Sequence, residues 1–171
     1  MEHYQWTSRQ GEKVFLQQGT RQVAVVTNDQ SAQVGEATWS LDITAATATA
    51  TLPDGTTLSA TGDKDTLGRS KTIKAQLKNS TASLINEAKQ NWIIDSEESQ
   101  KMGQFSGMAH GVRHPIIEWD AAAESLDEDE RVFLSWLARI ALEKHMISTT
   151  AVITWSLVVL IPLILLVFCF A

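Results

Sequence analysis

The sequence has almost no cysteine, since Cys169 is the only one in 171 residues. A single thiol forms no intramolecular disulfide, so a hydrophobic core must stabilise the fold. The residues before about 148 are enough for one domain with such a core. Cys169 itself lies in an apolar run. We expect it to be a small packing or lipid-facing side chain there, with palmitoylation as the alternative.

Basic residues are also scarce, with 14 Lys and Arg against 20 Asp and Glu and a net charge of −6. Binding to a phosphate backbone requires a basic face, which argues against a general nucleic-acid-binding protein. We find no glycine-rich phosphate loop, nucleophile elbow, Cys-x-x-Cys pair or Ser/His/Asp set. We therefore expect no catalysis, no cofactor, no metal and no small-molecule substrate.

The first residues, MEHYQWTSRQGEKVF, contain no apolar stretch. A secretory signal peptide needs an apolar core of about 7–15 residues. We therefore expect no secretory signal peptide.

An uncharged, mostly apolar segment occupies the other end of the sequence, over residues 149–171. At about 1.5 Å per helical residue, roughly 20 such residues match a hydrocarbon core of about 30 Å. A buried core helix is the alternative, but the segment is too long and too uniformly apolar for that. The sequence therefore predicts one C-terminal transmembrane helix over 149–171, following a domain over 1–148.

The charges around this segment predict its orientation. Arg131, Arg139 and Lys144 precede it, and no Lys or Arg follows it. Under the positive-inside rule the basic side stays in the cytoplasm. We expect a tail-anchored, single-pass protein of the plasma membrane, with a cytoplasmic N-terminal domain and the C-terminus at the outer side.

Several residues of the predicted span are poorly explained by anchoring alone. Pro162 removes a helical hydrogen bond and favours a kink. Small and hydroxyl-bearing side chains let another helix approach closely. Together they predict packing against larger integral membrane subunits through Thr150, Ala151, Thr154, Ser156 and Pro162.

The pattern of residues 1 to about 119 predicts a series of short strands. In SKTIKAQLK, apolar Ile73, Ala75 and Leu77 alternate with polar residues, the period of a half-buried strand. ITAATATATL alternates alanine with threonine, so one face of the strand carries only small side chains. Large side chains from another element must then pack against that face. Pro53-Asp54-Gly55 predicts a hairpin turn. The other strand-like segments are RQVAVVTN, QVGEATWSLD, QNWIID, MGQFSG and VRHPIIEW.

The composition changes at Asp120, where DAAAESLDEDERVFLSWLARIALEKHMI begins. Ser125 and Glu128 have the spacing of a capping box. The segment is apolar nearly all round, which is typical of a helix buried on most sides. We predict a core helix over about 125–146. The fold class is mainly β, an antiparallel β-barrel or sandwich closed around this C-terminal hydrophobic helix.

Two groups of residues could hold a cation. His110, His114 and Glu118 are spaced by four, but Gly111 and Pro115 break a helix there. In a strand the three would be too far apart to share one ion. The acidic residues 127–130 point around a helix axis rather than converging, so we expect a solvated first turn that complements the helix dipole.

The sequence has one basic stretch, formed by Lys64, Arg69, Lys71, Lys74 and Lys78. One interpretation is that charge protects an edge strand from pairing with another chain. The other is contact with anionic lipid headgroups or an acidic partner surface.

A meander of short antiparallel strands around a C-terminal helix resembles the tubby C-terminal-like fold, which phospholipid scramblases and LURP-one-related proteins share. The turns LPDGT and DSEES, the segment NWIIDSEESQKMGQFSG and the terminal helix carry this resemblance, over about residues 10–146. It implies binding of phosphoinositides, DNA or protein partners, or a link to lipid movement. The size and layout are also similar to accessory subunits of actinobacterial respiratory supercomplexes, in which cytochrome bc and cytochrome oxidase are joined.

We therefore expect a non-catalytic accessory or scaffolding subunit of a bacterial membrane complex, with the respiratory supercomplex as one setting. Its partners would be larger integral membrane subunits and membrane phospholipids. The alternative is a phospholipid-binding or lipid-handling protein of the scramblase or tubby-like type.

Overall fold

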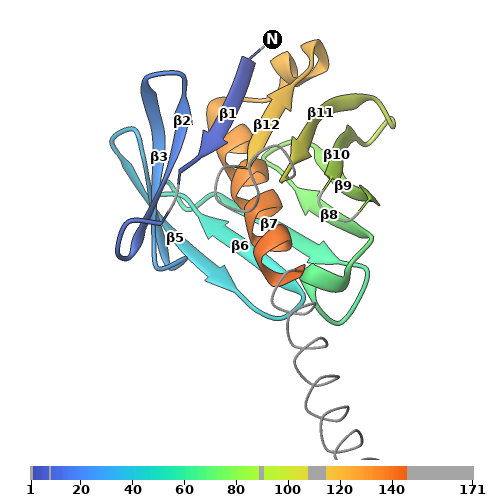
Figure 1. Cartoon of the computed structure of the whole chain (residues 1–171), viewed down its shortest axis with the longest axis horizontal. Helices are drawn as coiled ribbons and strands as arrows, with labels where there is room; N and C mark the ends of the chain where they lie inside the picture. Colours follow the sequence, from blue (N-terminus) through green and yellow to red (C-terminus); the bar gives the residue numbers. More distant parts are fainter. Residues whose placement is uncertain (1, 8, 89–90, 108–114, 146–171) are drawn as a thin grey trace, which may run out of the picture.

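The computed structural model describes residues 2–7, 9–88, 91–107 and 115–145. Twelve strands in these ranges form one closed antiparallel barrel, in which each strand pairs with its neighbours in sequence and β1 closes the ring by pairing with β12 (Figure 1). The predicted mainly-β class is confirmed. Of the two architectures left open by the sequence, the barrel is the one observed.

The strands are short and joined mostly by tight turns. They are β1 Glu2–Trp6, β2 Lys13–Gln18, β3 Arg21–Thr27, β4 Ser31–Val34, β5 Ala37–Ile43, β6 Thr47–Thr51, β7 Thr57–Gly62, β8 Thr72–Gln76, β9 Thr81–Ala88, β10 Asn91–Ser96, β11 Lys101–Ser106 and β12 Ile116–Trp119. A 3-10 turn, η1 (Leu67–Arg69), lies between β7 and β8, and η3 (Ala121–Ser125) follows β12.

Glycines with positive φ lie in several of the turns between strands, and two of these turns bear on the sequence predictions. The predicted turn at Pro53-Asp54-Gly55 joins β6 to β7, with φ of +86° at Gly55. The segment QVGEATWSLD, by contrast, is not one strand. Gly35 has a φ of +56° and separates β4 from β5, which pair with each other. The left-handed backbone of Gly35 is therefore where the segment reverses direction between the two strands.

The strands alternate between lumen and outer surface as the sequence predicts. On β8, Ile73 and Ala75 are buried while Lys74 and Gln76 are exposed. On β6, Ala48 and Ala50 are fully buried, and threonines face outward. The small alanine side chains leave volume in the lumen for large side chains from another element.

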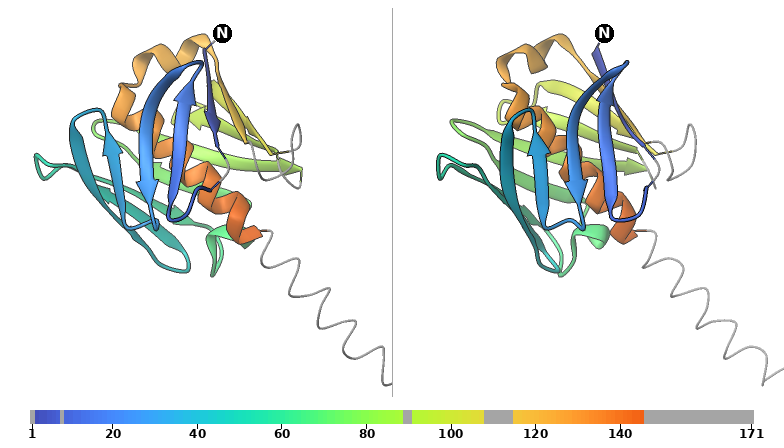
Figure 2. Two further views of the ribbon diagram at one scale, coloured as in Figure 1. Left: turned by 60° about the vertical axis from the view of Figure 1, so that its left-hand side comes forward. Right: turned by 90° about the vertical axis from the view of Figure 1, so that its left-hand side faces the viewer.

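That element is the helix over residues 128–145, drawn in orange inside the barrel in Figures 1 and 2. Every residue from 132 to 142 is buried. The largest of these side chains, Phe133 and Trp136, are in tilted contact with ring centroids 5.9 Å apart. The helix is therefore the central element of the core rather than a stalk.

The helix begins later than the Ser125 and Glu128 spacing suggested. Ser125 lies in η3, and the observed capping box joins Asp127 and Glu130. The Glu130 amide donates to Asp127 Oδ1 at 2.9 Å, and the Asp127 amide donates to Glu130 Oε2 at 3.1 Å. Two acidic residues three positions apart thus cap each other's backbone amide, as Ser125 and Glu128 were expected to do two residues earlier.

The meander gives the barrel two distinct ends. We call the end where the helix leaves the barrel the exit end; it is formed by the connections 7–12, 28–30, 44–46 and 63–71. The opposite end is formed by the turns 19–20, 35–36, 52–56, 77–80 and 97–100 and by the segment 120–127 before the helix. Figure 2 shows the helix running from one end to the other.

Over the ranges that the structure describes, no helix combines the length and apolarity needed to cross a bilayer. The predicted span, 149–171, lies outside those ranges. It therefore stays a prediction from the sequence.

Candidate functional site

The last turn of the helix is held by loops of the exit end. Lys144 Nζ donates a 2.5 Å hydrogen bond to the Thr44 carbonyl oxygen, in the β5–β6 connection. His145 Nδ1 lies 2.9 Å from the Gly68 carbonyl oxygen, in η1. Burial lowers the pKa of Lys144. The chain therefore leaves the barrel at a defined position.

Gly68 permits this close approach. A Cβ atom at this position would overlap the backbone of Lys144 and His145. The segment around it is internally bonded, because Ser70 Oγ donates to the Thr66 carbonyl oxygen and Asp63 Oδ1 accepts from the Lys71 amide, both at 2.9 Å. A rigid loop thus packs directly against the end of the helix.

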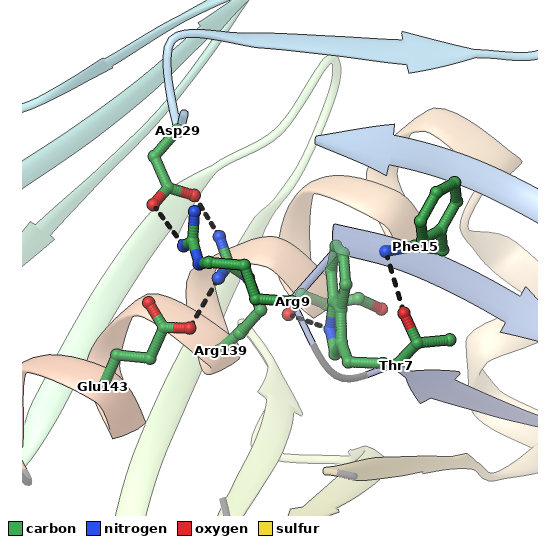
Figure 3. Close-up of polar contacts among 8 residues, drawn as sticks. Thr7, Arg9, Phe15, Asp29, Arg139 and Glu143 are labelled. Atoms are coloured by element: carbon green, nitrogen blue, oxygen red, sulfur yellow. Dashed lines mark hydrogen bonds and ion pairs between the residues drawn. The ribbon is translucent and has the colours of Figure 1, made fainter. Parts of the chain in front are cut away.

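One turn earlier, a buried cation ties the helix to a second loop. The Arg139 side chain is 3% exposed and forms ion pairs with Asp29, in the β3–β4 turn, and with Glu143 at 2.6 Å (Figure 3). Its guanidinium lies 5.1 Å from the centre of the Trp6 ring. Arg9 also reaches Asp29, at 3.4 Å. Asp29 therefore connects the helix with the β1–β2 and β3–β4 loops.

Sequence reasoning missed this cluster. It treated Arg139 only as a charge that orients the predicted span, although a single arginine in the apolar middle of a helix requires a partner when buried. Asn28 and Asp29 form the β3–β4 turn, with φ of 50° and 54°. Asp29 and Arg139 are 110 positions apart in the sequence, so only the fold brings them together.

The structure divides the predicted basic stretch. Lys64, Arg69 and Lys71 are exposed at the exit end, beside the end of the helix. Lys74 is exposed on the outer wall, on β8. Among the described residues, none of these four side chains forms an ion pair. They are therefore available for an anionic ligand or surface.

Lys78 lies at the opposite end and has internal partners. Its ammonium group lies 2.9 Å from Asp127 and 2.6 Å from Asp129, and its amide donates to Glu130 Oε1 at 3.1 Å. Burial by itself would lower the pKa of Lys78, but the two carboxylates outweigh it and raise the pKa. The same contact lowers the pKa of Asp127 despite its partial burial. Lys78 thus joins the β8–β9 turn to the start of the helix.

The edge-strand interpretation of the basic stretch is wrong. β8 pairs with β7 on one side and β9 on the other, and the barrel has no free edge. Charge is not needed there to block pairing with another chain.

The two candidate cation groups have different outcomes. Residues 127–130 are engaged with the protein itself: beside the contacts above, Glu128 pairs with Arg21. His110 and His114 lie outside the described residues, and Glu118 accepts a 2.5 Å hydrogen bond from Gln104. Within the described ranges, no group of His, Cys, Asp and Glu is arranged to hold a metal.

The expected membrane-packing residues all lie outside the described ranges: Thr150, Ala151, Thr154, Ser156 and Pro162. The structure shows where the chain leaves the barrel before it reaches these residues. The exit end holds Lys144 and His145 and presents three exposed cations beside them. This arrangement suits the control of orientation and contact at a surface.

The described residues thus form a closed twelve-strand antiparallel barrel with a core helix. Comparisons with protein-family models, curated proteins and solved structures give no match for the chain. The tubby-like resemblance therefore stays a prediction from the sequence.

Proposed function

We propose that this chain is a non-catalytic accessory subunit of a bacterial membrane complex, with the respiratory supercomplex as the first candidate. The apolar segment 149–171 spans the plasma membrane and packs against larger integral subunits. The barrel lies on the cytoplasmic side and covers or stabilises that face of the complex.

The fixed end of the core helix carries this proposal. Residues 139, 144 and 145 bind three loops of the barrel directly before the apolar segment. These contacts fix the place at which the chain leaves the barrel, close in sequence to the predicted span. A fixed exit point suits a subunit that must present one face of its domain to its partners.

The test is a comparison of two full-length proteins in the native membrane. In one, residues 149–171 are replaced by polyleucine of equal length; the other is wild type. Both should remain in the membrane, because length and hydrophobicity suffice for anchoring. Only the wild type should migrate with a large complex on a native gel after mild detergent extraction, since hydroxyl and small residues mediate helix contacts.

A Cys169→Ser variant is the matched control, because it leaves the proposed packing residues intact. Co-migration of the polyleucine protein at wild-type yield would show that the specificity lies in the barrel and that the span is only a tether. Migration of the wild type as a small free species would refute the subunit assignment.

The second candidate is a phospholipid-binding protein, which the exposed cations Lys64, Arg69 and Lys71 favour. The helix fills the lumen from 132 to 142, so lipid would have to bind outside the barrel rather than pass through it. Recovery of a free monomer with bound phospholipid from the same gel would support this candidate over the first.

A further inference from the structure

An open groove of about 400 Å³ lies at the end of the barrel opposite to the exit end. The β8–β9 turn lines it with Ser80, and the β10–β11 turn lines it with residues between 96 and 100. The segment before the core helix contributes Ala122 and Leu126. The closed barrel therefore brings three connections from distant parts of the sequence to one groove.

A β-bulge places an adaptable apolar side chain in this groove. The register of β10 and β11 shifts between Ile94 and Asp95, which leaves Met102 as the extra residue of β11. Such bulges redirect a side chain. Met102 lines the groove together with Leu126 and the partly buried Ala122. Because methionine is unbranched and polarisable, it accommodates ligands of different shape.

The turns beside the groove are held by their own hydrogen bonds. In the β10–β11 turn, the Ser96 amide donates to the Gln100 carbonyl oxygen at 2.9 Å and the Gln100 amide donates to Ser96 Oγ at 3.2 Å. In the β8–β9 turn, the Leu77 amide donates to the Ser80 carbonyl oxygen at 2.8 Å. The groove is therefore formed before any ligand arrives, which lowers the entropic cost of binding.

The groove carries uncompensated negative charge. Glu97 and Glu98 line it and are exposed, and within the described ranges neither side chain forms an ion pair or a hydrogen bond. Among the described residues that line the groove, none is basic. The nearest lysines in sequence are engaged elsewhere: Lys78 binds the start of the helix, and Lys101 lies 3.6 Å from Asp120.

A polar depression of about 480 Å³ continues the groove across the outer wall of β7, β8 and β9 and shares Thr81 and Glu97 with it. Its lining includes the amide of Gln76 and the hydroxyl of Ser83, which can bind the backbone of an extended segment. Lys74 is the one cation among the described residues of this lining, and it lies nearer the exit end, paired with Ser83. The negative charge is thus concentrated where the two depressions meet.

Carboxylates beside an apolar lining match the two parts of a lysine or arginine side chain. The methylene stem packs on apolar atoms, and the charged head donates to carboxylate oxygens. A metal ion would use only the carboxylates, and over the part of the chain that the structure describes no acidic group is arranged to hold one.

We propose that this groove binds a basic segment of a partner subunit. A lysine or arginine of that segment lies along Met102 and Leu126, with its head at Glu97 and Glu98. This inference rests on the proposed function and names the chemistry of the partner. Cytoplasmic segments of integral membrane proteins are rich in lysine and arginine. The groove lies away from the exit of the helix, so an anchored barrel leaves it open to such a loop or tail.

The experiment uses the full chain in its native membrane, with the photo-cross-linker p-benzoylphenylalanine at one position. Gln100, an exposed residue of the groove, is the probe position. Thr38, exposed at the same end of the barrel on β5, is the control position. We expect cross-linking from position 100, and not from position 38, to a partner segment that mass spectrometry shows to carry lysine or arginine.

Reversal of charge tests the contact itself. Glu97→Lys with Glu98→Lys should reduce cross-linking from position 100 by about tenfold or more, because like charges then face each other. Glu36→Lys with Asp42→Lys changes the net charge equally at exposed positions outside the groove and should leave the yield unchanged. Glutamate in place of the basic residues of the cross-linked segment should restore the yield in the first variant, which also shows that this variant is folded.

A cross-link to a second copy of this chain, or to a segment without basic residues, would refute the proposed partner. Equal yields at positions 100 and 38, or a yield unaffected by reversal at Glu97 and Glu98, would refute the groove. Co-migration of the same protein with a large complex on a native gel would then leave the subunit assignment intact. A wild type that migrates as a small free species would refute both.

Discussion

The guanidinium of Arg139, in the core helix, is bound by the carboxylate of Asp29, in the β3–β4 turn of the exit end. Arg139 is nearly inaccessible to solvent, whereas Asp29 is 24% exposed and also binds Arg9. The contact fixes how far the helix extends through the barrel. It therefore determines where the following segment begins.

Asp29→Asn should destabilise the barrel by about 3 kcal/mol, because it leaves a buried guanidinium without its main counter-charge. Asparagine tolerates the left-handed backbone of this position, so the turn itself is preserved. The measurement is chemical unfolding of the full chain in detergent. Asp42→Asn, at an exposed position of β5, is the control and should be close to neutral.

A second substitution distinguishes charge from turn geometry. Asp29→Asn combined with Arg139→Leu should be more stable than Asp29→Asn alone, because no uncompensated charge then stays buried. If the double variant is the less stable of the two, the loss comes from the turn and not from the ion pair.

Trp136→Ala should cost about 3–5 kcal/mol, as expected for a large buried aromatic side chain. Among the described residues its indole Nε1 has no hydrogen-bond partner, so Trp136→Phe should lose only volume and cost clearly less. Unfolding curves of the two variants give the comparison. Equal losses would mean that an unseen hydrogen bond of the indole, and not packing, holds the helix.

Acid should weaken the contact between the β8–β9 turn and the start of the helix. The pKa of Asp127 is lowered in the folded protein, so its contribution is present above its ordinary value of 3.8 and is lost as the pH falls through the lowered value. Lys78, whose pKa is raised, stays protonated throughout. Lys78→Gln should therefore lose less stability than wild type between about pH 5 and pH 2.

Lys74→Gln is the matched control for this pH profile, because Lys74 is an exposed lysine on the adjacent strand. Its profile should follow the wild type. If Lys78→Gln also follows the wild type, the acid sensitivity arises elsewhere in the molecule.

The barrel should lie on the cytoplasmic side of the membrane. In a Cys169→Ser background, a membrane-impermeant maleimide should label Thr57→Cys, at the exposed start of β7, only after right-side-out vesicles are permeabilised. The positive-inside rule predicts this protection. Labelling of intact vesicles would invert the topology and move every proposed partner contact to the outer side.

Local patterns predicted most of the fold. The alternation on β8 and the Pro53-Asp54-Gly55 turn depend on neighbouring residues, and both are observed. The helix was recognised because its apolar residues surround its axis. Its start was misplaced, since Ser125 and Asp127 offer equivalent caps and only the contacts of Lys78 and Glu130 select one of them.

The candidate site was harder to predict, because it depends on closure of the barrel. The five basic residues are close in sequence, but β8 places Lys78 at one end and Lys71 at the other. Asp29 and Arg139 meet only when the helix occupies the lumen. Pairings between distant segments leave no periodic trace in a single sequence.

The order of the elements also determines when this protein can fold. The ring closes between β1 and β12, and the helix that fills it follows all twelve strands. During synthesis the chain emerges from its N-terminus, so the lumen-facing side chains have nothing to pack against until residue 142 has left the ribosome. By then the predicted span, which begins at 149, is the next segment to emerge. Completion of the barrel and delivery of the span to the membrane therefore fall in the same short interval, and a delay in one exposes the hydrophobic surface of the other to chaperones.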